Sequence, residues 1–173
     1  MGKLLAALLV GCGVLAGAGM YYLQVYYYYV DVTAQVSDIH LTPAAGGAPE
    51  PIGAKMTRAI DADSSPIRFR ACFTTDAGLD VLTADYAGYP DAEPLTAPGW
   101  FDCFDAREIG EALEAGTARA VLGTRDITWG IDRVVAVFPD GRGFVWHQIN
   151  PCGAVVFDGQ PLPDGCPPPP ESD

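Results

Sequence analysis

The chain has 173 residues, a formal net charge of −12 and an apolar content of 49%. The 143 residues after residue 30 hold nine basic and 22 acidic side chains, so their net charge is −13. This charge argues against nucleic acid and against anionic lipid headgroups as partners. It permits a basic periplasmic protein as a partner, although the need for solubility alone would also explain an acidic surface. The length suffices for one domain with its own core.

Residues 1–30 predict a transmembrane anchor. Lys3 is the only charge before Asp31, the residues from Leu4 to Met20 are apolar or small, and six tyrosines follow within nine positions. Such a run reaches the thickness of a bilayer core, and its aromatic collar is typical of a lipid–water interface. The tyrosines expected at that interface include Tyr21, Tyr22, Tyr26 and Tyr29.

Two other fates of this segment stay open. Ala16-Gly17-Ala18 fits a signal-peptidase site, and Leu9-Val10-Gly11-Cys12 fits a lipid-attachment site. All three fates export the remaining chain. Because Lys3 precedes the helix and no basic residue follows until Lys55, we expect a cytoplasmic N-terminus and a periplasmic bulk at a bacterial inner membrane.

Small residues on the anchor predict helix packing. Ala7 with Gly11, and Gly13 with Gly17, have the small-xxx-small spacing that lets helix backbones approach closely in lipid. Other transmembrane subunits are the partners that this spacing favours. An idle tether is the alternative, since glycine is common in signal-like segments.

The rest of the chain divides into an extended arm or linker over 31–51, a domain over 52–166 and a Pro-rich acidic tail over 167–173. The arm ends at the loop-forming stretch 43–49. Residues 67–73 alternate as a half-buried strand, with Ile67, Phe69, Ala71 and Phe73 on its apolar face.

Two helices follow. Thr75 is expected to cap the first, over 76–86, and Asp105 the second, where Glu108 completes a capping-box-like pair and Gly116 gives the C-terminal stop. Further strands are expected over 118–122, 131–138, 144–149 and, after a turn at 150–153, over 154–158. This order predicts the α+β class: one antiparallel sheet with about two short helices.

Four cysteines in the exported part predict disulfides. Three pairings are possible; we favour Cys72 with Cys103 and Cys152 with Cys166. A redox-active or metal-carrying thiol pair is the alternative, although no C-x-x-C motif occurs. His147, on the Val145 side of its strand, is expected to be hydrogen-bonded; copper binding by His147 with a thiol stays open.

An aromatic cluster surrounds one of these cysteines. Trp100, Phe101 and Phe104 are either a docking patch or packing around the disulfide. No catalytic, cofactor-binding or metal-binding residues are predicted: there is no phosphate loop, no G-x-S-x-G and no histidine-containing triad.

Several segments together resemble a known family. The segments MYYLQVYYYY, DADSSPIRFRACFTT, APGWFDCFDA, GIDRVVAVFPDGRGFVWHQIN and CPPPP are similar to an alphaproteobacterial family of small single-pass membrane-anchored proteins of unknown function. The resemblance covers nearly the whole chain. It implies the anchored topology and brings no activity, ligand or catalytic residue.

These patterns favour a non-enzymatic accessory or assembly subunit of an inner-membrane complex, respiratory or photosynthetic. Such assemblies recruit small single-helix subunits. A periplasmic ligand-binding or sensing module and a thiol or copper chaperone for oxidase maturation are the alternatives.

Overall fold

The protein is described from a computed structural model, which covers residues 2–170. Four α-helices occur: α1 (Gly2–Tyr22), α2 (Leu79–Asp85), α3 (Ala106–Glu114) and α4 (Pro151–Phe157). Three short turns of other helix types are η1 (Leu23–Tyr27), η2 (Thr33–Gln35) and η3 (Pro66–Arg68). The strands are β1 (Val30–Asp31), β2 (His40–Leu41), β3 (Glu50–Pro51), β4 (Lys55–Asp61), β5 (Arg70–Thr74), β6 (Arg119–Thr128), β7 (Ile131–Val137) and β8 (Arg142–Ile149).

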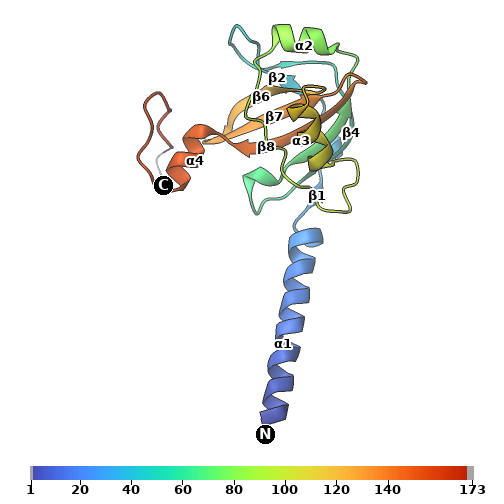
Figure 1. Cartoon of the computed structure of the whole chain (residues 1–173), viewed down its shortest axis with the longest axis vertical. Helices are drawn as coiled ribbons and strands as arrows, with labels where there is room; N and C mark the ends of the chain where they lie inside the picture. The colour runs from blue at the N-terminus through green and yellow to red at the C-terminus, as the bar shows by residue number, and fades with distance from the viewer. Residues whose placement is uncertain (1, 171–173) are drawn as a thin grey trace.

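Six strands form one antiparallel sheet in the order β1-β4-β5-β8-β7-β6, and β2 pairs with β3 in a small second sheet. Helix α1 projects away from the domain, and α3 lies across one face of the sheet (Figure 1). The α+β class with a mainly antiparallel sheet is therefore confirmed. Besides the two expected helices, the domain contains a third, α4, which was not predicted from the sequence.

One face of the sheet, here the arm face, packs against residues 32–56 and α2. Its core includes Val135, Val145 and Phe73 from the strands and Leu82 from α2. The arm supplies Ile39 and Leu41, which are 2% and 0% exposed. The segment over 31–51, predicted as an extended arm or linker, therefore contributes apolar side chains to the domain core.

The opposite face, here the α3 face, is also buried. It packs against α3 and the loop over 97–104, and its core includes Trp146, Phe101, Phe104 and Ile109. Cys72 and Arg70 lie on this face at 5% and 3% exposure. The expectation of a half-buried strand was wrong, because the long loop between α2 and α3 covers the second face as well.

The strand itself begins later than expected. Pro66 opens the η3 turn, in which Arg68 N–H donates to the Ser65 carbonyl, so regular strand pairing starts only at Arg70. Proline favours this start because its fixed φ suits the first position of a helical turn and its nitrogen has no hydrogen to donate.

The helix caps follow the sequence signals in part. The Asp105 carboxylate accepts from Arg107 N–H and Glu108 N–H at the start of α3, as expected, and Gly116 ends the turn with φ of 70°. Glu108 does not close a capping box, because its carboxylate pairs with Arg142. Thr75 does not cap α2, which begins after Gly78.

The segment after β8 is a helix, where a turn and strand were expected. The Asn150 side chain accepts from Gly153 N–H at 2.9 Å, and Pro151 occupies the first turn of α4. Asparagine at the N-cap followed by proline is a helix-start signal that outweighs the β-prone residues after it. The close approach of Gly153 to Gly130, where a Cβ would lie 2.2 Å from the Gly130 carbonyl oxygen, seats α4 against the β6–β7 turn.

The structure contains both favoured disulfides. Cys72 bonds to Cys103 and thereby ties the loop before α3 to the α3 face. Cys152 bonds to Cys166, which closes a loop from α4 towards the Pro-rich tail. Residues 167–170 of that tail are described; 171–173 lie outside the described residues.

Candidate functional site

The N-terminal helical segment, Gly2–Tyr27, could cross a membrane by its length and composition. It has 26 residues, and its most apolar stretch of 18 residues has a mean hydropathy of 2.0 and no residue buried against the domain. A signal sequence near an N-terminus meets the same criterion. The candidate site is where this segment meets the domain.

Three hydrogen bonds and one ring contact join the end of the helix to the domain. The Arg68 guanidinium donates to the Gln24 side-chain oxygen at 2.6 Å and to the Gln24 carbonyl at 3.3 Å. The Trp100 indole N–H donates to the Val25 carbonyl at 2.7 Å. The rings of Tyr29 and Trp100 meet edge to face at 6.0 Å. We call Gln24, Val25, Tyr29, Arg68 and Trp100 the anchor junction.

Each domain residue of the anchor junction is positioned by a defined element. Arg68 ends the η3 turn, and its guanidinium also lies 5.5 Å from the Tyr29 ring centre. Trp100 is carried by the loop that the Cys72–Cys103 disulfide holds to the sheet. Beyond Tyr29 the chain enters the sheet at once, because Val30 pairs with Asp61 of β4. No spacer therefore separates helix and domain.

The predicted docking patch divides between this junction and the core. Phe101 and Phe104 are 1% and 5% exposed, so the docking hypothesis is wrong for these two rings. Phe104 packs edge to face against Phe144 and Trp146. Trp100 is half-buried and contacts the end of the anchor.

Arg70 lies between the sheet and the loop that carries Trp100, and it holds this loop through the carbonyls of Leu95 and Thr96. Its guanidinium is buried and donates to four backbone carbonyls, those of Leu95, Thr96, Ile67 and Phe69, at 2.7 to 3.4 Å. Burial lowers the pKa of Arg70 to about 10, so it stays cationic at neutral pH. Within residues 2–170 it has no carboxylate partner; the carbonyl dipoles satisfy it instead.

His147 is buried on the arm face and its ring is fully engaged. It stacks on Phe69 at 4.7 Å, its Nδ1 lies 2.7 Å from the Pro66 carbonyl, and its Nε2 accepts from Arg133 Nε–H at 3.1 Å. Burial, helped by the Arg133 charge, lowers the pKa of His147 to about 3. The ring is thus neutral, with Nδ1 as donor, and neither nitrogen is free for the copper that the sequence left open.

A buried polar network holds α4. The Asp132 carboxylate, 1% exposed, accepts from Asn150 Nδ2 and Asp126 N–H at 2.9 Å and from the Tyr89 hydroxyl at 3.3 Å. Burial beside Asp132 raises the pKa of Tyr89, so the hydroxyl remains a donor. Every oxygen of Asp132 is thereby satisfied within the fold.

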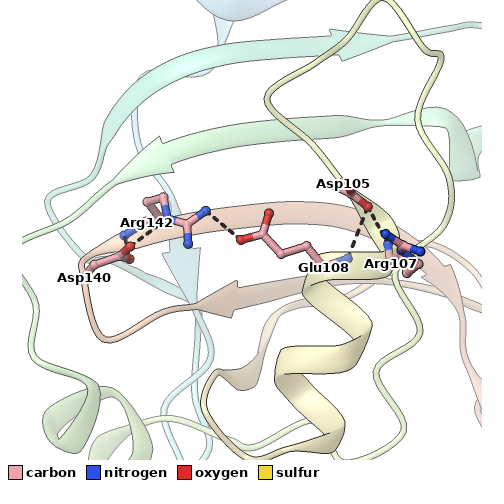
Figure 2. A network of polar contacts seen from close by, with 5 residues as sticks. All are labelled: Asp105, Arg107, Glu108, Asp140 and Arg142. Carbon is pink, nitrogen blue, oxygen red and sulfur yellow. Dashed lines mark hydrogen bonds and ion pairs between the residues drawn. The ribbon is translucent and has the colours of Figure 1, made fainter.

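A second, exposed network joins α3 to the β7–β8 hairpin. Arg142 bridges Asp140, at 2.8 Å, and Glu108, at 3.0 Å, while Asp105 caps the same helix (Figure 2). The Arg142 side chain holds the pKa of Asp140 below its usual range through a hydrogen bond. These contacts position α3 and leave no unpaired group for chemistry.

Metal and thiol chemistry find little support in the described chain. Residues 2–170 contain no group of three or more histidine, cysteine or carboxylate side chains arranged for a metal ion. Cys12, in the anchor, is the one cysteine outside a disulfide. The domain therefore has no free thiol for a chaperone reaction.

A groove of about 570 Å³ lies between α3, β6 and the loop over 88–94. Its charged lining residues are Glu93, Glu114 and Arg119, and the rest of its wall is mostly small residues and prolines. The groove offers no set of converging polar groups that would identify a ligand class.

Some predicted positions stay predictions. An added Cβ at Gly11, Gly13 or Gly17 would meet nothing in the chain, so the small-residue faces are open but unpartnered here. The tyrosine collar is likewise exposed, apart from Tyr29. Gln24 and Arg68 were not predicted as site residues. The signal for Gln24 was a lone polar residue among tyrosines, and the signal for Arg68 was an arginine directly after Pro66 and Ile67.

Comparison with known proteins gives one match. A model for a family of unknown function, DUF6446, matches residues 39–167. No curated protein and no solved structure matches the chain. The apolar helix and two disulfides, taken alone, are features of a membrane-anchored domain that faces an oxidising compartment.

Proposed function

We propose, from the premise that the chain belongs to the DUF6446 family of unknown function, that it is a non-enzymatic accessory or assembly subunit of an inner-membrane complex. Its helix spans the membrane with the N-terminus in the cytoplasm, and its acidic domain stands in the periplasm. A respiratory or photosynthetic complex is the host that we would test first.

The observation that carries this proposal is the anchor junction. A domain on a simple tether needs no contacts with its anchor, whereas here Arg68 and Trp100 bind the backbone of Gln24 and Val25. Contacts of this kind fix the height and orientation of the domain above the membrane. A fixed domain presents the same surface to a neighbouring subunit in every copy, which is what an assembly subunit requires.

The open helix faces support the same proposal. Gly13 and Gly17 leave room for a second helix backbone, and no part of the domain covers them. Packing between close helix backbones drives association in lipid, where the hydrophobic effect between helices is lost.

The test is affinity purification of the full-length protein from gently solubilised membranes. Gly13→Leu with Gly17→Leu should abolish co-purification of the partner subunits, because the leucines separate the helices. The matched control is Ala16→Leu with Gly19→Leu, which adds comparable bulk about 110° around the helix and should retain the partners. Equal recovery from both variants would contradict helix-mediated assembly.

A further inference from the structure

We propose that the anchor junction is also a lipid-binding surface, on which Arg68 binds the phosphate of a phosphatidylethanolamine headgroup. This inference rests on the membrane anchoring proposed above. It adds a ligand class and a binding residue to a surface whose other contacts are internal to the chain.

The length of the anchor sets the depth of Arg68. The 20 residues from Leu4 to Leu23 span about 30 Å as a helix, which is the thickness of the hydrocarbon core. Gln24 is the next residue and, apart from the tyrosines, the first strongly polar side chain after Lys3. Because Arg68 bonds to Gln24 at 2.6 Å, its guanidinium lies at the level of the headgroups.

Arg68 has donors to spare at that level. A guanidinium carries five N–H donors, and the two hydrogen bonds of Arg68 both go to Gln24. The side chain is half-buried, and no carboxylate within residues 2–170 pairs with it. Arginine binds phosphate through two parallel N–H donors, so the remaining donors suit a lipid phosphate.

The neighbours of Arg68 are residues that favour the interface. Tyr29 lies under the guanidinium, and Trp100 packs against Tyr29. Both rings have an apolar body and a polar tip, which is the arrangement enriched where hydrocarbon meets headgroups. The surface therefore combines a phosphate ligand with two interfacial aromatic side chains.

The charge of the domain selects the kind of phospholipid. Residues 31–173 have a net charge of −13, which repels an anionic headgroup. Phosphatidylethanolamine is neutral overall, so it brings a phosphate to Arg68 without that repulsion. An anionic phospholipid is accordingly expected to bind less tightly.

The experiment is a lipid titration of the delipidated full-length protein in detergent, read by native mass spectrometry. Dioleoyl phosphatidylethanolamine should bind the native protein, and Arg68→Gln should weaken binding about tenfold, equivalent to about 1.4 kcal/mol at 25 °C. Arg125→Gln is the matched control, since Arg125 is exposed on β6 at the opposite edge of the sheet. Its affinity should equal that of the native protein.

A second variant separates lipid binding from a structural role of Arg68. Gln24→Ala removes the shorter of the two hydrogen bonds of Arg68, the one to the Gln24 side chain, but leaves the guanidinium, so lipid binding should persist. If Gln24→Ala weakens binding as much as Arg68→Gln, Arg68 acts only through the helix and the proposal is overturned. Unchanged binding by Arg68→Gln, or equally tight binding of dioleoylglycerol, which lacks phosphate, also overturns it.

Two readouts keep this inference distinct from the proposed function. Lipid binding by Gly13→Leu with Gly17→Leu, the variant designed to abolish assembly, tests the lipid site alone, and we expect it to persist because the anchor junction is untouched. Competition by millimolar inorganic phosphate tests whether the ligand of Arg68 is a lipid phosphate or free phosphate. We expect the lipid to remain bound. Displacement of the lipid would assign the site to free phosphate and overturn the lipid proposal.

Discussion

The two faces of the six-stranded sheet are built differently. On the arm face, aliphatic side chains such as Val135 and Val145 pack against Ile39, Leu41 and other residues of the N-terminal arm. On the α3 face, large rings, a disulfide and a buried arginine pack under a long loop. Apart from His147 and its partner Arg133, the arm face is an apolar core. The α3 face also positions Trp100, so it couples the core to the anchor junction.

This difference predicts that damage to the α3 face reaches the junction, whereas damage to the arm face changes stability alone. The Cys72–Cys103 disulfide is the strongest link in that coupling, since it holds the loop that carries Trp100.

Replacing both Cys72 and Cys103 with alanine should give the largest loss. The disulfide closes a loop with a sequence separation of 31 residues, and the chain-entropy relation gives a loss of about 4 kcal/mol. Urea unfolding of the detergent-solubilised protein measures it. Leu41→Ala on the arm face, expected to cost about 3 kcal/mol, is the comparison. Both variants should unfold at a lower urea concentration than the native protein. Only the cysteine variant should also raise hydrogen exchange around Gln24 and Trp100 in native buffer.

Arg70→Leu is expected to cost about 3 kcal/mol. Removing the guanidinium leaves buried carbonyls of the 95–96 loop without a donor, at about 1–3 kcal/mol for each unsatisfied group. The exposed-pair variant Arg58→Leu removes a surface contact to Asp102 and should cost no more than about 1 kcal/mol. If the two variants unfold at the same urea concentration, the carbonyl contacts of Arg70 do not hold the loop.

His147 gives the arm face a dependence on pH. Its folded-state pKa, about 3, lies below the ordinary value of 6.5, so the unfolded chain takes up the proton first as the pH falls. The stabilisation is complete above pH 6.5 and is lost progressively towards pH 3. Between pH 7 and pH 5 the free energy of unfolding should fall by about 2 kcal/mol from this group.

Urea midpoints at the two pH values test this expectation. His147→Gln should lack the drop assigned to His147, while His40→Gln, at an exposed position, should retain it. A drop of the same size in His147→Gln would assign the pH dependence to other groups.

The sequence predicted what depends on local patterns and missed what depends on distant packing. The Asp105 cap and the β7–β8 hairpin are local, and both occur. The burial of Arg70 depends on a loop 25 residues away, which no local period reveals. The anchor junction has the same origin, because Gln24 and Arg68 are 44 residues apart and meet only once β1 has paired with β4. The fold class was therefore predictable; of the site, the sequence named Tyr29 and Trp100 but not their contact with each other or with Gln24 and Arg68.

The smallest expected effect concerns the exposed network of Figure 2, which joins α3 to the sheet. Glu108→Gln removes an ion pair whose partners are 49% and 46% exposed, so it should cost about 0.2–1 kcal/mol at low salt and less in 1 M NaCl. Glu111→Gln, which removes a 3.8 Å surface pair with Arg107, is the control and should change little. Because Ile109 packs α3 onto the sheet by burial, neither variant should alter hydrogen exchange at Trp100. A change there would mean that surface charge, and not the apolar core of the α3 face, couples this helix to the junction.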